Sequence, residues 1–438
     1  MKKSLIALAA LAAVSAVSAQ STVSVYGRLD MGYSSANQTN AWGIVLPNTS
    51  TAFQEQKTST TSLGANNSRT TSRLGFSGVE DLGGGLKAMF NYELGLNADN
   101  IGTHTGTANK TMSENDGTRI GFGNTRLANI GVSGNFGTVV LGTFLNAHDA
   151  MRGYNANTFG MAGGDFMSRH NANQSDASGA TIGATFVGAA TAYMGNTVLF
   201  ANSTAANSTA TTGVTGTAVA LKAINGVGFN GRSHNAVAYS SPSIGGFTVG
   251  LGVQADRTSR TANPTSQAAD TRSVSGETIS LTYAAGPLKA TYVNGSSKLV
   301  DMDNTSTSAY TSLKNKDAGF AASYDLGVAQ VFLMNESVTG NVTGGLLGGY
   351  SVKTAATEVG VKFPMGAFTP YVAMGQGKIT INNTTADSVF KTTATQYGTT
   401  YDLSKRSYMY AAYGADKVTL SGVGLKRSGT TIGLVHSF

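Results

Sequence analysis

Cysteine is absent from the 438-residue sequence, and long apolar runs are missing beyond its N-terminal region. Without cysteine, the fold can contain neither disulfides nor thiolate metal sites. Because no later stretch reaches ~18 consecutive apolar residues, we expect no transmembrane helix. The chain must therefore be held together by backbone pairing and side-chain packing.

Proline is scarce, at 6 residues, and the basic residues form no cluster although the net charge is +7. Dispersed lysines and arginines, without an arginine-rich run or a basic helix, argue against binding to nucleic acid. Glycine is abundant at 56 residues, and Thr, Ser, Tyr, Val and Ala fill segments of alternating polarity, which favours an all-β fold. The mean hydropathy of −0.05 suits a barrel that is apolar outside and polar inside, and equally a soluble, glycine-rich β protein.

The N-terminal region has the parts of a secretory signal peptide. Lys2 and Lys3 supply positive charge, an apolar stretch of Leu, Ile, Ala and Val follows, and short side chains precede a cleavage site after Ala19. We therefore expect residues 1–19 to be the signal peptide and residues 20–438 to form one barrel domain.

Strands are indicated where apolar and polar side chains alternate strictly. The first such segment places Val25 and Leu29 on one face and Tyr26 and Arg28 on the other. The clearest hairpin follows the same rule on both sides of a Glu-Asp-Leu-Gly-Gly-Gly turn, whose glycines can adopt positive φ. In a barrel wall, the apolar face of each strand meets lipid and the polar face meets the lumen.

The connections between these strands are alternately short and long. Short turns are expected at residues 80–85, 134–137, 242–246, 285–287, 325–327, 364–367 and 403–406. Longer polar segments are expected at residues 34–70, 97–124, 145–231, 256–273, 297–315, 338–352, 378–394 and 416–428. Seven short and eight long connections join sixteen strands. Short turns at one end and long loops at the other are typical of a 16-stranded antiparallel transmembrane β-barrel.

The third long segment, residues 145–231, contains 87 residues. A structureless loop of this length is uncommon in a compact domain. It makes sense if the flanking strands close a wide barrel and the segment folds into the lumen and narrows it. Alternatively, residues 181–187, 197–201 and 218–224 add strands and give an eighteen-stranded barrel, although no turn there resembles the other seven.

Several stretches carry a specific resemblance to a known family. They are SVYGRLD at residues 24–30, SRLGFSGVEDLGGGLKA at 72–88, GNFGTVVLG at 134–142, NAVAYSSP at 235–242 and LSKR at 403–406. With these stretches and its terminal phenylalanine, the chain resembles the general diffusion porins of Gram-negative outer membranes, in particular those of β-proteobacteria. The resemblance covers nearly the whole mature chain. It implies an outer-membrane location, a sixteen-stranded barrel, a homotrimer and a third loop folded into the lumen.

The resemblance also implies a wall of arginines in the pore constriction. By motif, Arg73, Arg126 and Arg232 match wall positions, and strand alternation turns Arg28 inward as well. Arg126 departs from simple alternation, which would place it on the outer face. A bulge or an end-of-strand twist near Thr125 would be needed to turn it into the lumen. An arginine on the lipid face at mid-depth would cost ~2–4 kcal/mol, which favours the lumen. There the arginines either steer ions selectively or only stay hydrated and brace the loop.

On the third loop, Asp149 and Asp165 match acidic positions that face this arginine wall in the family. The loop is longer than the family usually shows. It also lacks the glutamate that relatives often place before a Phe-Gly-Gly stretch, here Phe-Gly-Met-Ala-Gly-Gly at residues 159–164. The constriction is therefore expected to be narrower and less acidic than in those relatives. The terminal Phe438 is implied as the signal for barrel insertion.

Catalytic motifs are missing from the sequence. None of the five histidines has the spacing of a His-Glu-x-x-His metal site, and no Gly-x-Ser-x-Gly elbow precedes a helical pattern. We expect no enzyme, no cofactor and no metal site. The predicted function is passive diffusion of small hydrophilic solutes and ions through a water-filled, weakly anion-selective channel in outer-membrane lipid. The alternative is an outer-membrane adhesin or receptor barrel whose lumen is plugged by residues 145–231.

Overall fold

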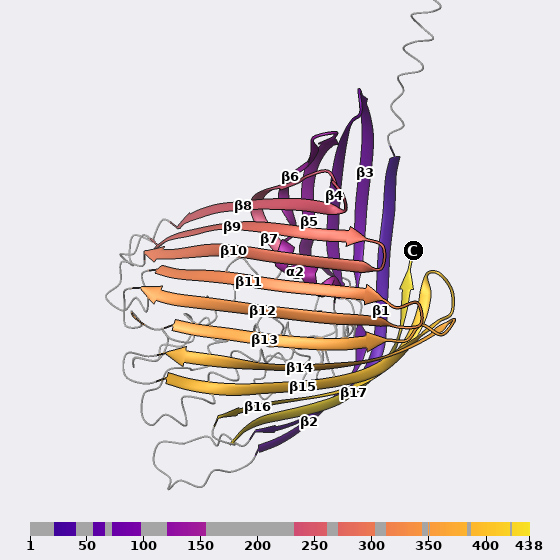
Figure 1. Cartoon of the computed structure of the whole chain (residues 1–438), viewed down its shortest axis with the longest axis vertical. Coiled ribbons are helices and arrows are strands. Elements are labelled where there is room, and N and C mark those ends of the chain that lie inside the picture. Colours follow the sequence, from indigo (N-terminus) through magenta and orange to yellow (C-terminus); the bar gives the residue numbers. More distant parts are fainter. Residues whose placement is uncertain are drawn as a thin grey trace, which may run out of the picture.

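The structure is a computed structural model in which nearly every element is a β-strand (Figure 1). It describes residues 22–40, 56–65, 72–97, 121–154, 232–260, 270–302, 312–343, 349, 351–382, 387–420 and 423–438. Within these ranges, the helices are too short to cross a membrane. The proposed signal peptide and most of the third loop lie outside the described residues.

The strands belong to one sheet. They are β1 (Thr22–Asn40), β2 (Gln56–Ala65), β3 (Arg73–Gly83), β4 (Leu86–Asn97), β5 (Gly121–Gly134), β6 (Gly137–Leu145), β7 (Arg232–Ser240), β8 (Phe247–Arg260), β9 (Asp270–Ala285), β10 (Leu288–Met302), β11 (Ser312–Asp325), β12 (Gln330–Thr343), β13 (Ser351–Lys362), β14 (Phe368–Asn382), β15 (Asp387–Asp402), β16 (Ser407–Leu420) and β17 (Val423–Ser437). Each pairs antiparallel with its neighbours.

The sheet closes into a barrel because β1 pairs with β17 from Arg28 to Asn40 (Figure 1). On its other side, β1 pairs with two strands in succession. Its first half, from Thr22 to Arg28, pairs with β3, and its second half, from Met31 to Asn40, pairs with β2. Since β2 and β3 occupy one position in the wall, the seventeen described strands fill sixteen positions. The predicted sixteen-stranded barrel is confirmed.

All seven predicted short turns lie between the expected strands. The glycine turn after β3 has the positive φ angles that its sequence predicted: Gly83, Gly84 and Gly85 have φ of 82°, 60° and 82°. The strands run further than expected at the opposite end. For example, β1 continues to Asn40 although a loop was predicted from residue 34. Beyond the ~9–11 residues that span a bilayer, both strand faces are polar, and backbone pairing with β2 and β17 sustains the strand.

The predicted facing of the strands is also confirmed. On β1, Val23 and Val25 are 67% and 59% exposed on the outside, whereas Asp30 is completely buried. The same holds on β4, where Phe90 and Tyr92 are exposed and Glu93 is buried. The barrel therefore presents apolar side chains outward and places polar and small side chains toward its interior.

Two short helices follow β6 and mark the start of the third loop. They are α2 (Ala147–Met151) and η1 (Arg152–Tyr154), and they contact strands from β9 to β12. Figure 1 shows α2 inside the ring of strands. The Met151 side chain is completely buried in a cluster with inward-facing Val293, Ala321 and Met334. The described start of the loop thus lies inside the barrel. The segments proposed for an eighteen-stranded barrel lie outside the described residues.

The contact between Met151 and the wall depends on a glycine. A Cβ atom added to Gly319 on β11 would overlap the methyl group and sulfur of Met151. The missing side chain at Gly319 therefore creates the recess into which Met151 packs. This recess fixes where α2 lies along β11.

Candidate functional site

Arg28 and Arg73 are direct cross-strand partners on β1 and β3. Directly opposed side chains of an antiparallel pair lie on the same face and ~4.5–5.5 Å apart at their Cβ atoms. The Arg28 side chain also reaches β17, where its Nε donates a hydrogen bond of 3.2 Å to Ser437 Oγ. Two like charges opposite one another are unfavourable unless an opposite charge lies close by.

Glu93 on β4 supplies that opposite charge. Its Oε1 lies 3.6 Å from Arg73 Nη1 and accepts a hydrogen bond of 2.5 Å from Arg126 Nε. Tyr26 donates to Glu93 Oε2 at 3.2 Å and to Asn91 Oδ1 at 2.8 Å. Glu93 is 4% exposed. This buried carboxylate holds two guanidinium groups and one phenol in a single network.

Arg126 reaches Glu93 through a β-bulge. Along β4, Glu93 pairs with Leu127 and the next residue, Leu94, pairs with Thr125, so Arg126 is an extra residue in β5. An extra residue locally reverses the alternation of side chains. The bulge predicted near Thr125 is therefore present, and the Arg126 guanidinium points toward the Glu93 carboxylate.

Arg232 begins β7 and pairs with Leu145, where the third loop leaves the wall. The charges of Arg126, Arg28 and Arg232 all act on Arg73, as does that of Glu93. The four arginines identified from the sequence thus form one electrostatic cluster, although they come from four strands. We refer to Arg28, Arg73, Arg126 and Arg232 as the arginine cluster.

The side chains of the two predicted acidic partners, Asp149 and Asp165, are not described by the structure. Asp149 lies in α2, but its side chain lies outside the described part of the structure, as does all of Asp165. The contact of Glu93 with the arginine cluster was not anticipated from the sequence. Asp30 is also inside the barrel, where its Oδ1 accepts a hydrogen bond of 2.8 Å from Tyr410.

The arginine cluster and α2 lie on different parts of the wall. In the ring of sixteen positions, β3, which carries Arg73, and β11, which carries the recess for Met151, are eight positions apart. In a closed sixteen-stranded ring, eight positions are half the circumference. The start of the third loop is therefore docked on the side of the barrel opposite Arg73.

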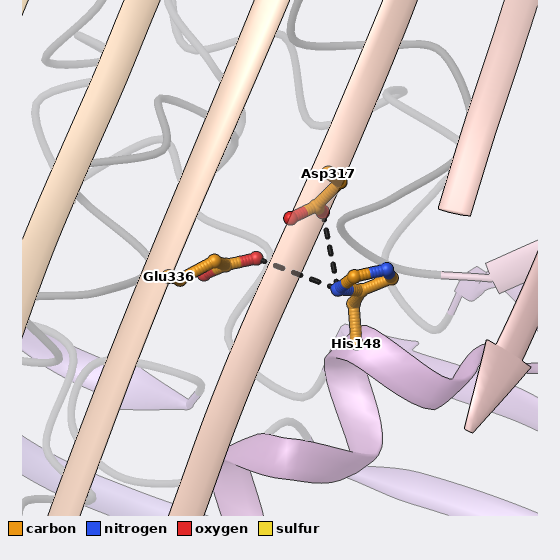
Figure 2. A group of neighbouring side chains, drawn as sticks. All are labelled: His148, Asp317 and Glu336. Carbon is orange, nitrogen blue, oxygen red and sulfur yellow. Dashed lines mark ion pairs between the residues drawn. The ribbon is translucent and has the colours of Figure 1, made fainter. Parts of the chain in front are cut away.

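A second polar group on the inner wall was missed by the sequence reasoning, which expected no metal site. His148 of α2 approaches Asp317 on β11 and Glu336 on β12 (Figure 2). These three residues come from separate elements and form no local motif. No spacing or motif in the sequence links them.

Phe438 lies at the seam that closes the barrel. Its backbone exchanges two hydrogen bonds of 3.0 Å with Gly27 on β1. The aromatic ring lies over Gly27, because a Cβ atom there would overlap the ring. The residue thus contributes to strand closure. Its predicted role in barrel insertion stays a prediction.

Comparison with known proteins identifies the family. The family model described as Gram-negative porin matches residues 7–419. The chain belongs to the Gram-negative porin family. As a porin, it is an outer-membrane protein, and its family and fold are those of channel proteins.

One relative of this porin is the outer membrane porin protein 32 of Delftia acidovorans. It is 34% identical over 142 residues, a match that covers 32% of this chain and 31% of that protein. The matched region thus spans about a third of the relative's length.

Solved structures share the porin fold. An anion-selective porin from Comamonas acidovorans has a TM-score of 0.58 and 21% identity, covering 96% of this chain and all of the other. The outer-membrane protein OmpT of Vibrio cholerae, expressed in the outer membrane, has a TM-score of 0.51 and 13% identity, covering 95% of this chain and 98% of the other. At these identities, the likeness concerns the fold.

Proposed function

We propose that this porin forms a water-filled channel for passive diffusion of small hydrophilic solutes and ions, with a modest preference for anions. The observation that carries the proposal is the arginine cluster, in which Arg28 and Arg73 are direct cross-strand partners and Arg73 and Arg126 contact the same carboxylate. Glu93 contacts two members of the cluster, Arg73 and Arg126. The four arginines and Glu93 together carry more positive than negative charge.

Electrostatics explains how such a cluster selects ions. A channel whose walls have a low dielectric constant focuses the field of its charges and raises the local concentration of counter-ions. Rings or ladders of arginine favour anions over cations. Glu93 offsets part of the field, which keeps the preference modest. The anion-selective porin of Comamonas acidovorans, which shares this fold, supports the same direction of selectivity.

The constriction in this proposal has two sides. One is the arginine cluster, and the other is the third loop, residues 145–231, with Asp149 and Asp165 as its acidic groups. The docking of α2 on β9 to β12, opposite β3, supports this arrangement. The loop narrows the passage between these two sides.

Reversal potentials in a KCl gradient test the selectivity. In planar bilayers, the wild type should favour chloride, and Arg73→Ala should reduce the ratio of chloride to potassium permeability. Lys316→Ala is the matched control, because Lys316 is exposed between the inward Asn315 and Asp317 on β11 and carries the same charge outside the lumen. A cation-selective wild type, or equal effects of the two variants, would show that the arginine cluster does not set selectivity.

The same bilayers distinguish the channel from a receptor barrel with a plugged lumen. Discrete conductance steps support diffusion, whereas folded protein that inserts without conducting would favour the adhesin or receptor alternative. No catalytic activity is part of the proposed function.

The proposal includes a mature chain that begins after Ala19 and assembles as a homotrimer in outer-membrane lipid. Membership of the porin family supports both features. The mass of the purified chain should correspond to residues 20–438. Light scattering in detergent should give three chains for each particle, and a particle of one chain would contradict the trimer.

A further inference from the structure

His148, Asp317 and Glu336 form a buried group of nitrogen and oxygen atoms on the inner wall (Figure 2). His148 Nδ1 lies 3.1 Å from Asp317 Oδ2 and 3.8 Å from Glu336 Oε1. The side chains of His148 and Asp317 are 0% exposed and that of Glu336 is 3% exposed. The three possible ligand atoms all lie within 4.8 Å of one another.

The wall positions the two carboxylates. Gly319 on β11 is the cross-strand partner of Glu336 on β12, and Asp317 is the partner of Val338. Asp317 and Glu336 are therefore diagonal neighbours on the inward face of one antiparallel pair, a relation that brings long side chains within reach. Their distance is set by the sheet and does not depend on α2.

Helix α2 positions the imidazole. Met151 packs into the recess at Gly319, directly beside Glu336 in the ladder. His148 precedes Met151 by three residues, so both side chains lie on the same face of the helix. The packing of Met151 thus places His148 beside the two carboxylates. Figure 2 shows the His148 ring directed between them.

The spacing of these atoms suits a small divalent cation. In a tetrahedral zinc site with ligand bonds of ~2.0–2.2 Å, adjacent ligand atoms are about 3.4 Å apart. The contacts of 3.1 and 3.8 Å from Nδ1 lie on either side of that value. A cation between the three groups would bind both carboxylates and the ring nitrogen together.

Charge and ligand chemistry point to the class of metal. Two carboxylates and a neutral imidazole balance the charge of one divalent ion. Imidazole suits zinc, copper, iron and nickel, whereas calcium and magnesium prefer sites made of oxygen alone. Three protein ligands leave a fourth tetrahedral position, which water occupies in open zinc sites.

We propose that His148, Asp317 and Glu336 form a binding site for a divalent transition metal, with Zn²⁺ as its representative ion. The bound metal ties α2 to β11 and β12 and thereby fastens the start of the third loop to the wall. The site does not depend on the direction of ion selectivity, so a cation-selective channel would leave this proposal intact.

Metal content of the folded, untagged protein tests the site. The protein in detergent is treated with a chelator, incubated with Zn²⁺, dialysed and analysed by mass spectrometry for bound metal. We expect one tightly held zinc per chain, and His148→Gln, Asp317→Asn and Glu336→Gln should each lower the affinity by at least about tenfold, as loss of a ligand does at zinc sites. Zinc that is not retained, or is retained equally by these variants, would overturn the proposal.

Matched controls use the same substitutions elsewhere. His436→Gln removes an exposed histidine that contacts Ser407, and Glu277→Gln removes an exposed carboxylate that accepts a hydrogen bond from Ser296. Both should bind zinc as the wild type does. If either control loses the zinc, the metal is bound at a different place and the assignment is wrong.

Two measurements on the wild type keep the test independent of how the variants fold. Co²⁺ in place of zinc should give the intense visible absorption of a tetrahedral site, and the weak spectrum of six-coordinate Co²⁺ would contradict the proposed ligands. Hydrogen exchange should slow at the α2 amides, including that of Ala150, which donates to Asn146, when zinc is added. Unchanged exchange would indicate that His148 is held by ion pairing alone.

Discussion

Glu93 is the residue that links two members of the arginine cluster, Arg73 and Arg126, through one carboxylate. It contacts both Arg73 and Arg126 and is almost fully buried. Its carboxylate offsets part of the positive charge of the cluster and holds two guanidinium groups in place. Its removal should therefore alter selectivity and the order of the arginines together.

We expect Glu93→Gln to increase the preference for anions about twofold, because a unit charge ~8 Å from an ion in water changes its energy by about 0.5 kcal/mol. The ratio of chloride to potassium permeability, from reversal potentials, measures this change. Glu277→Gln is the control, since it removes a carboxylate from an exposed position on β9. A lower anion preference in Glu93→Gln would show that positioning of the arginines matters more than the lost negative charge.

At the scale of elements, the contact between α2 and β11 holds the described start of the third loop against the inner wall. The contact combines an apolar side chain in a recess with a polar group beside it. Met151 occupies space that any side chain at position 319 would take. This arrangement gives α2 one defined position along the strand.

We expect Gly319→Ala to destabilise the docked α2 by about 1–2 kcal/mol, because an added methyl group forces Met151 out of its recess. Hydrogen exchange of the α2 amides measures this local stability. Gly276→Ala on β9 is the control, since a Cβ there meets its nearest neighbours at ordinary contact distances, 3.4 Å or more. In a Met151→Ala background, Gly319→Ala should have little further effect. Additive effects of the two substitutions would contradict the proposed packing.

For the whole molecule, closure joins the two ends of the described chain. The seam between β1 and β17 brings Gly27 beside Phe438. It also brings Arg28 opposite Ser437, so the same register that closes the barrel orients one member of the arginine cluster. One strand register therefore both closes the barrel and positions Arg28 in its wall.

We expect deletion of Phe438, or Phe438→Ala, to reduce the amount of folded barrel in the outer membrane and to leave chain in the periplasm. Fractionation followed by heat-dependent electrophoretic mobility measures folded and unfolded forms. Phe136→Ala is the control, because Phe136 is also an exposed aromatic residue and lies in a short turn. Normal assembly of the Phe438 variants would contradict its role in insertion.

Salt dependence is a property of the channel as a whole. The range of charge interactions falls from ~10 Å at 0.1 M salt to ~3 Å at 1 M. We therefore expect the anion preference to be largest at low salt and to weaken at high salt. Permeability ratios at constant gradient and increasing mean KCl concentration test this. A preference that stays constant would indicate selection by pore size and not by charge.

The sequence alone was sufficient for the number of wall positions, the places of the short turns and the facing of the strands. Each follows from local chemistry. A period of two in polarity assigns faces, and glycine-rich turns allow positive φ. The ends of strands such as β1 were not predictable, because pairing with a neighbour and not the polarity pattern maintains them.

The tertiary structure decided which side chains meet. Arg126 needed an extra residue in β5 to reach Glu93, and a bulge is defined by the register of two strands. The arginine cluster and the group of His148, Asp317 and Glu336 each combine elements far apart in the chain. Alternation says which way a side chain points. Only the closed barrel determines what lies next to it, because strand register and helix docking set distances between residues remote in sequence.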